Sequence, residues 1–287
     1  MVKFKLSAFS DEYSASLDEQ IEGLTINKVR MSELRGIDGK NVSDLSADEA
    51  AEVARKLELS GIGVSAIGSP IGKIKITDSM DAHLDKLKNT CEVAAAVGTS
   101  RIRMFSFFIP DGQYDETKNE VIDRMGKMLD VAEEYGVDLC HENEKGIWGD
   151  TPERCRELLD TFEGRLSCVF DPANFIQCGC TDLKSGFHLL KKYLAYMHIK
   201  DAVKNGTVVP AGRGIGTIPE LLAIINREFS GEMILTLEPH LRVFAGLDAL
   251  EGEHKTSLGN TFKTSAEAFE AAVTNLRYCV PRTAQVL

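Results

Sequence analysis

Four residues of the kind that bind metal ions recur along the second half of the sequence: Glu142, Asp171, His198 and Glu238. Each lies at or near the end of a short apolar run, and the intervals between them are 29, 27 and 40 residues. Three carboxylates brought to one point repel one another unless a cation lies between them. If the fold places these four side chains together, they predict a site for one divalent metal ion.

The donor set restricts the identity of that ion. Three carboxylates and one imidazole are mostly hard ligands, which suit a six-coordinate ion with positions open to water or substrate oxygens. Mn²⁺ is the ion we expect first, with Mg²⁺ and Co²⁺ as alternatives. Zn²⁺ also binds histidine and carboxylates, so the sequence leaves it open.

Two glutamates beside one metal ion suit proton transfer at a carbon next to a carbonyl. A glutamate takes the proton, and the ion stabilises the negative charge of the resulting enediolate. Return of the proton to the neighbouring carbon isomerises an aldose and a ketose, whereas return from the opposite face epimerises the substrate. Both reactions need the same groups, so the ligand set does not separate them.

The elements that must position these residues alternate regularly along the chain. Short apolar runs typical of strands are separated by amphipathic stretches, a pattern that favours parallel β/α units. The runs lie at 3–9, 28–33, 61–67, 100–106, 136–142, 166–171, 195–200 and 233–238.

Helix boundaries support this interpretation. Ser46 and Thr264 each begin a capping pattern with glutamate three residues later, and Thr151 precedes a proline suited to a first turn. Thr217 precedes another proline-containing helix start. Gly61, Gly98 and Gly136 follow predicted helices, where a left-handed residue commonly ends the helix.

Eight such units predict a single (β/α)₈ TIM barrel domain over residues 1–287. The competing fold, an open doubly wound sheet, lacks support because no G-x-G-x-x-G follows the first strand. In a barrel, side chains at the carboxyl ends of the strands line the active site. The long segment of about 239–263 between the last strand and last helix is expected to cap this end or pack on another subunit, through Phe244, Leu247 and Leu250.

Further residues at this end could contact a substrate. Lys200 is two residues beyond His198, so it faces the same side and could bind a substrate oxygen or pair with a ligand carboxylate. Arg213, in Gly212-Arg213-Gly214, could bind an anion, or the glycines could only shape a turn. His240 stands in the same relation to Glu238, and Glu33 and Arg103 are expected at the rim, at other strand ends.

The chain resembles the xylose-isomerase-like TIM-barrel superfamily of sugar phosphate isomerases and epimerases over essentially its whole length. The resemblance implies that Glu142, Asp171, His198 and Glu238 bind one divalent ion and that the two glutamates act as acid and base. Many members have histidine three residues after the aspartate, where this chain has Asn174, which then takes the substrate-facing place. The motifs that carry the resemblance are Ser32-Glu33-Leu34-Arg35, His141-Glu142-Asn143, Asp171-Pro172-Ala173-Asn174, His198-Ile199-Lys200-Asp201, Gly212-Arg213-Gly214 and Leu237-Glu238-Pro239.

The expected function is therefore a metal-dependent sugar isomerase or epimerase with a small carbohydrate substrate. A lyase or dehydratase resembling inosose dehydratase would use the same metal and base. An apurinic endonuclease is disfavoured because those enzymes need a histidine-rich metal cluster, and this chain has six histidines and a net charge of −11.

The expected setting is the cytoplasm. The seven cysteines are scattered, which indicates a reducing compartment, and we expect no nucleic-acid or membrane partner. The sequence leaves open a homo-oligomer, the identity and phosphorylation of the substrate, and the choice among isomerase, epimerase and lyase.

Overall fold

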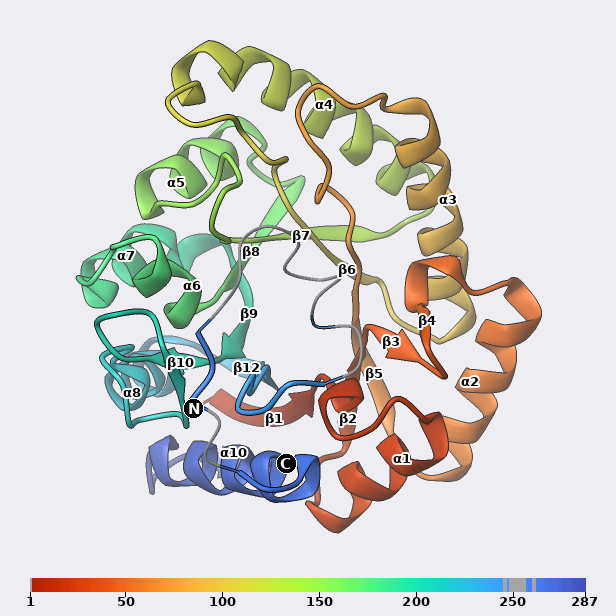
Figure 1. Cartoon of the computed structure of the whole chain (residues 1–287), viewed down its shortest axis with the longest axis vertical. Helices are drawn as coiled ribbons and strands as arrows, with labels where there is room; N and C mark the ends of the chain where they lie inside the picture. The colour runs from red at the N-terminus through yellow and green to blue at the C-terminus, as the bar shows by residue number, and fades with distance from the viewer. Residues whose placement is uncertain (1, 245–246, 248–256, 260–261) are drawn as a thin grey trace.

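Eight parallel strands close into a barrel surrounded by helices (Figure 1). The computed structural model describes residues 2–244, 247, 257–259 and 262–287. The first and last barrel strands pair along their whole length, which closes the ring and confirms the predicted (β/α)₈ fold. In chain order the barrel strands are β1 (Val2–Ala8), β2 (Met31–Leu34), β5 (Gly63–Gly68), β6 (Arg101–Met104), β7 (Asp138–Glu142), β8 (Leu166–Phe170), β9 (Leu194–Ile199) and β12 (Gly231–Leu237).

Helices between the strands form the outer layer (Figure 1). Ser46 and Thr264 form the predicted capping boxes, and the hydroxyl of Thr151 accepts from the Arg154 N–H. Thr217 differs, because its backbone is left-handed (φ 52°) and its side chain does not cap the helix that follows. The helices are α1 (Leu17–Ile26), α2 (Ala47–Leu59), α3 (Asp81–Ala96), α4 (Tyr114–Glu134), α5 (Pro152–Thr161), α6 (Pro172–Gln177), α7 (Leu183–Leu190), α8 (Ile218–Glu228) and α10 (Ser265–Cys279).

Shorter elements decorate the barrel. Two hairpins follow barrel strands β2 and β9, and a C-terminal strand pairs with the first residues of β1. These elements are β3 (Gly36–Ile37) with β4 (Lys40–Asn41), β10 (Asp201–Ala202) with β11 (Val208–Val209), β13 (Gln285–Val286), and the 3₁₀ turns η1 (Ser10–Glu12), η2 (Val42–Asp44) and η3 (Lys191–Tyr193).

The barrel has two apolar regions. The larger one packs the outer faces of the strands against the helices, and a small separate cluster contains Cys140, Val169, Tyr196, Ile234 and Ala66. Successive side chains alternate between the faces of a strand. The residue two places after Cys140, Val169 or Tyr196 therefore faces the same interior, and those residues are three of the four expected metal ligands. The small cluster thus forms a floor below the predicted site.

The segment after β12 begins by packing inward. Leu241, Phe244 and Leu247 are buried, whereas Leu250 lies outside the described residues, as do 245–246, 248–256 and 260–261. The prediction that this segment caps the barrel mouth or contacts another subunit therefore stays a prediction.

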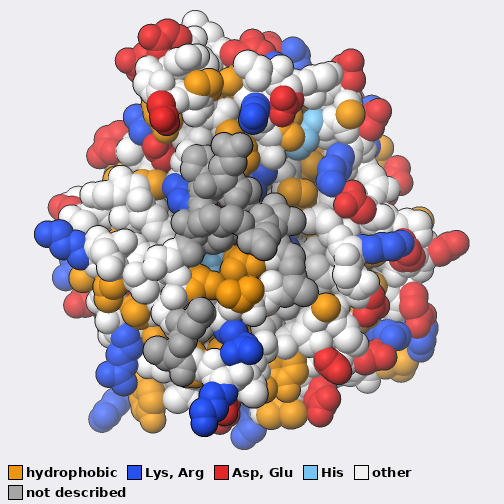
Figure 2. Space-filling view, in the orientation of Figure 1, with side chains coloured by type: hydrophobic (Ala, Val, Ile, Leu, Met, Phe, Trp, Pro, Cys, Tyr) orange, Lys and Arg blue, Asp and Glu red, His pale blue; other side chains and the backbone are white. Residues whose placement is uncertain are grey.

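Acidic and basic side chains are interspersed around the periphery of the face shown in Figure 2. Within the described residues, no helix combines the length and apolar character needed to cross a membrane.

Candidate metal centre

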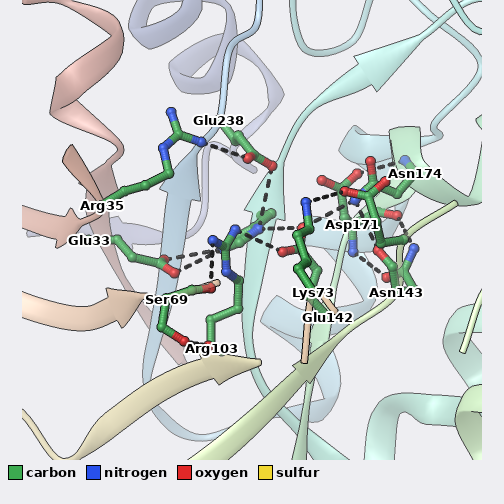
Figure 3. A network of polar contacts seen from close by, with 12 residues as sticks. Glu33, Arg35, Ser69, Lys73, Arg103, Glu142, Asn143, Asp171, Asn174 and Glu238 are labelled. Carbon is green, nitrogen blue, oxygen red and sulfur yellow. Dashed lines mark hydrogen bonds and ion pairs between the residues drawn. The ribbon is translucent and has the colours of Figure 1, made fainter. Parts of the chain in front are cut away.

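The four expected metal ligands converge at the carboxyl end of the barrel. Each of Glu142, Asp171, His198 and Glu238 contributes one ligand-type atom, and these atoms all lie within 4.8 Å of one another. Glu142 ends β7, Asp171 follows β8, His198 lies in β9 and Glu238 follows β12. All four are buried. The close-up in Figure 3 shows the three carboxylates among the polar residues that surround them.

His198 is fixed by carboxylates on both ring nitrogens. Its Nδ1 lies 2.9 Å from Oε1 of Glu142, and its Nε2 lies 3.2 Å from Oε2 of Glu33. Glu33 also accepts a hydrogen bond of 3.0 Å from the Tyr196 hydroxyl. A carboxylate that holds one ring nitrogen of a histidine sets the tautomer and leaves the other nitrogen for a metal. Glu33 is therefore placed to orient His198 with Nδ1 towards the ligand cluster.

An arginine holds one oxygen of each glutamate. Nη1 of Arg103 donates to Oε2 of Glu142 at 3.0 Å, and Nη1 of Arg35 donates to Oε1 of Glu238 at 3.0 Å (Figure 3). The remaining oxygens, Oε1 of Glu142 and Oε2 of Glu238, face His198 Nδ1 at 2.9 and 3.6 Å. Each glutamate thus presents one oxygen to the cluster.

Asp171 is held through its backbone and one carboxylate oxygen. Its Oδ1 caps α6 by accepting from the Asn174 N–H at 2.9 Å, and its backbone N–H donates to Asn143 Oδ1 at 3.0 Å. Its Oδ2 is buried and accepts no hydrogen bond, although the Lys200 ammonium lies 3.1 Å away as an ion pair. A buried carboxylate oxygen without a hydrogen-bond donor is available to a cation.

Lys200 and Asn174 both lie within the cluster. Nζ of Lys200 donates to Oε2 of Glu238 at 2.8 Å, and Nδ2 of Asn174 donates to Oε1 of Glu142 at 3.2 Å. Of the two alternatives for Lys200, the structure shows the pairing with ligand carboxylates.

The charges of the centre favour a further cation. Six buried carboxyl groups surround three arginine and lysine side chains, and burial raises the pKa of one of the six, Glu12, to about 8. Burial raises the pKa of Asp171 to about 7 despite the nearby Lys200. Burial alone would lower the pKa of His198, but Glu142 and Glu33 raise it to about 10. The raised pKa of His198 shows excess negative charge around its ring, and a divalent ion would compensate that charge and the burial of the Asp171 carboxylate. The carboxylates are Asp11, Glu12, Glu33, Glu142, Asp171 and Glu238, and the cations are Arg35, Arg103 and Lys200.

The two glutamates are ionised at neutral pH. Burial raises the pKa of Glu142, but the charges of His198 and Arg103 outweigh it and lower the pKa to about 2. Burial acts in the same direction on Glu238, where the charges of Lys200, His198 and Arg35 hold the pKa well below its ordinary value. Both side chains are therefore in the form that a general base requires.

His240 reaches the edge of the centre in a strained conformation. Its φ is 42°, and its Nε2 lies 3.4 Å from Oε1 of Glu12 and 3.5 Å from Oε1 of Glu238. The ring is buried, yet neither ring nitrogen makes a hydrogen bond. Burial lowers its pKa well below the ordinary value, so the imidazole is neutral.

Arg213 is not brought to the centre. It is exposed, and its Nε donates to Asn275 Oδ1 at 3.3 Å. The glycine N–H groups beside it bind an internal anion, the buried Asp201 carboxylate, at 2.9 Å from Gly212 and 3.0 Å from Gly214. The glycine-rich loop is therefore anchored to β10 by a side chain of the protein itself.

The sequence pattern placed two residues of the centre at the rim of the barrel and did not single out two others as site residues. Glu33 and Arg103, expected at the rim, contact ligand residues directly. Arg35 and Asn143 were noticed only as parts of motifs. Arg35 could have been found, because it lies two residues after Glu33 and so shares its side of the chain.

Comparisons with known proteins agree with this fold. The family model described as xylose isomerase-like TIM barrel matches residues 29–257. No curated protein sequence matches the chain.

Several solved structures share the fold. The IOLI protein with a bound zinc atom has a TM-score of 0.71 and 17% identity, covering 97% of this chain and 98% of that one. The probable 3-DHS dehydratase AsbF from Bacillus anthracis has a TM-score of 0.70 and 13% identity, covering 96% and 99%. D-psicose 3-epimerase from Clostridium cellulolyticum H10, solved with D-tagatose, has a TM-score of 0.68 and 15% identity, covering 97% and 99%. At these identities the likeness shows the fold.

Proposed function

Because the chain belongs to the xylose isomerase-like TIM barrel family, we propose that it is a divalent-metal-dependent isomerase or epimerase. The proposed substrate is a small sugar, a sugar phosphate or a related hydroxy-carbonyl compound. The observation that carries the proposal is the buried group of Glu142, Asp171, His198 and Glu238 at the carboxyl end of the barrel. The structural neighbours described above include an epimerase and a probable dehydratase.

The four ligands would hold one ion, which we propose to be Mn²⁺. Three carboxylate oxygens and one imidazole nitrogen suit Mn²⁺ or Mg²⁺ and also admit Co²⁺ or Zn²⁺. A bound ion would polarise a substrate carbonyl and stabilise the negative charge of an enediolate. The zinc atom bound by one neighbour supports the presence of a metal ion in this fold. Metal analysis of the purified protein would identify the ion in this chain.

Glu142 and Glu238 are the proposed acid and base. Glu142 ends β7 and Glu238 follows β12, and these strands are three steps apart in the ring, so the two carboxylates approach a bound substrate from separated directions. Arg103 and Arg35 fix their carboxylate planes. Both are ionised, and each can accept a proton from a substrate carbon. Two bases on opposite faces support epimerisation, and one base acting on adjacent carbons supports isomerisation.

Substrate binding is assigned to polar groups around the ligands. Lys200 Nζ can donate to a substrate oxygen from beside Glu238, and Asn174 lies next to Glu142. The two unbonded ring nitrogens of His240 can meet a substrate hydroxyl. Arg213 is exposed and bonded to Asn275, so it has no part in this proposal.

A dehydratase is the second candidate, and Lys200 is the observation that favours it. Its ammonium lies 2.8 Å from a carboxylate oxygen of the proposed base Glu238. A buried cation beside a base can assist the departure of a hydroxyl group after proton removal, which is what a β-elimination requires.

The test is exchange of substrate C–H protons with D₂O, followed by NMR. Metal-loaded protein is offered a panel of ketoses, sugar phosphates and inososes. The wild type and the surface control Glu116→Gln should exchange one C–H next to the carbonyl of a true substrate, and Glu142→Gln and Glu238→Gln should lose most turnover. Wild-type exchange rates in both active-site variants would show that neither glutamate is the base. A product lacking one water would select the dehydratase.

The proposal extends to the domain organisation, the compartment and the partners of the protein. We propose that residues 1–287 form one barrel domain that acts in the cytoplasm on a small molecule and not on nucleic acid. The seven cysteines are unpaired, which supports a reducing compartment.

A further inference from the structure

A second carboxylate–histidine cluster adjoins the metal centre and shares one residue with it. Glu12, Glu238 and His240 each offer a ligand-type atom, and these atoms lie within 4.8 Å of one another. All three side chains are buried. Glu238 therefore stands between two groups of metal-type ligands, with Oε2 towards Lys200 and Oε1 towards the second group.

The second cluster already contains a cation. The guanidinium of Arg35 donates to Oε1 of Glu238 at 3.0 Å and to Oε1 of Glu12 at 3.2 Å. It also binds both oxygens of Asp11, at 2.8 and 3.0 Å. Arg35 is 3% exposed, so it meets three carboxylates with little competition from water. A paired, two-point arginine–carboxylate contact is among the strongest and most directional hydrogen-bonded arrangements in proteins.

Aromatic rings fix the guanidinium on two sides. Its carbon lies 4.2 Å from the ring centre of Phe9 and 4.9 Å from that of Phe244. Phe244 belongs to the segment after β12, and Phe9 follows β1. These contacts hold a planar group in one orientation, which a mobile lysine would not reproduce.

His240 gives an independent indication that this cluster suits a cation. Its ring is buried and close to two carboxylates, but Nδ1 and Nε2 have no hydrogen-bond partner. Its backbone is in the left-handed region (φ 42°), which is uncommon for residues other than glycine, although histidine, asparagine and aspartate adopt it more often than the rest. A buried imidazole that lies beside carboxylates and lacks hydrogen-bond partners has ring nitrogens available to a cation.

We propose that Arg35 is a positioning residue that takes the place of a second divalent ion. Its fixed charge neutralises the cluster of Glu12, Glu238 and Asp11, and its bond to Oε1 of Glu238 leaves Oε2 for the first metal centre. The inference rests on the proposed metal centre. The result is a site with one ion, in which Glu238 presents one oxygen to that ion instead of bridging two.

Metal stoichiometry tests this directly, without a substrate. Metal-stripped full-length protein is titrated with Mn²⁺ by calorimetry and by the EPR signal of free Mn²⁺. The wild type and the control Arg55→Ala, an exposed arginine of α2, should bind about one ion per chain. Arg35→Ala should bind about two, because three carboxylates and His240 then face each other without a counter-ion. Arg35→Lys keeps the charge and should bind about one.

A double variant locates the additional ion. Arg35→Ala combined with His240→Ala should return to about one Mn²⁺ per chain. If Arg35→Ala does not fold, Arg35→Gln retains donors for Asp11 while removing the charge, and its stoichiometry is judged by the same criterion.

Two outcomes would overturn the proposal: a neutral Arg35 variant that binds no additional ion, or a wild type that binds two. A wild type that binds no ion, with a gain of one in Arg35→Ala, would instead refute the proposed function and support the role of Arg35.

Discussion

Replacement of Glu33 by glutamine should weaken metal binding although Glu33 is not a proposed ligand. Its carboxylate contacts His198 Nε2 at 3.2 and 3.3 Å and accepts from the Tyr196 hydroxyl at 3.0 Å. The side chain is 1% exposed, so no water replaces these contacts. The amide of glutamine has the same shape but no charge. It can also turn its NH₂ group towards Nε2, which would favour the tautomer that protonates Nδ1, the nitrogen facing the ligand cluster.

The size of the effect follows from the bond that is changed. A hydrogen bond to a charged group contributes about 1.5–3 kcal/mol and a neutral one about 0.5–1.5 kcal/mol, so the expected loss is about 1–2 kcal/mol. Since 1.36 kcal/mol corresponds to a factor of ten, Mn²⁺ affinity should fall roughly 5- to 30-fold. This overlaps the lower part of the range of about 10- to 100-fold typical of residues that orient a ligand. Removing this charge also lowers the pKa of His198, which reduces competition by protons. The loss should therefore be smaller at pH 7 than at pH 9.

Calorimetric titration of metal-stripped Glu33→Gln with Mn²⁺ at these two pH values measures both quantities. Glu116→Gln, which removes an exposed charge in the first turn of α4, is the control for net charge. Thermal unfolding without metal verifies that the variant is folded. A dissociation constant within twofold of wild type at pH 9 would refute the role assigned to Glu33.

Three further predictions concern protons, the glycine-rich loop and a close backbone contact. Mn²⁺ affinity should rise about tenfold per pH unit between pH 7 and 10, because His198 (pKa about 10) must lose a proton before it binds the ion. Below pH 7 the affinity should change more steeply, because Asp171 (pKa about 7) is also protonated there. Titration in buffers of different ionisation enthalpy counts these protons, and a pH-independent affinity would contradict the assignment. Asp201→Ala should lower the free energy of unfolding by about 3 kcal/mol or more, because the Asp201 carboxylate accepts hydrogen bonds from four backbone N–H groups at 2.8–3.0 Å. Denaturant titration measures this free energy, and a decrease of less than about 1 kcal/mol would show that water replaces these bonds. Gly72→Ala should destabilise by several kcal/mol, because a Cβ there would lie 1.9 Å from a backbone oxygen. Gly112→Ala, at a similar positive φ in open space, should cost only about 1–2 kcal/mol, and equal losses in the two variants would exclude the steric explanation.

The sequence predicted the barrel because its signals are local and repeat. A strand needs a short apolar run and a helix needs a cap and an apolar stripe, and both are read within a few residues. The eight predicted runs correspond to β1, β2, β5, β6, β7, β8, β9 and β12, with ends that differ by a few residues. Regular repetition of these units also determines that the carboxyl ends of the strands meet at one end of the ring. The convergence of Glu142 and His198, which are 56 residues apart, follows from that repetition.

The structure alone decided how the polar groups around the centre pair. Arg35 and Glu238 are 203 residues apart and meet only because β1 closes the ring between β2 and β12. The loop containing Arg213 looked like an anion site in the sequence, and the anion it binds is Asp201. Loops have no periodicity to read, and a charged side chain several bonds long can reach any of several partners. Which partner it takes depends on the three-dimensional path of the chain and on burial, because a charge removed from water requires a counter-charge at hydrogen-bonding distance.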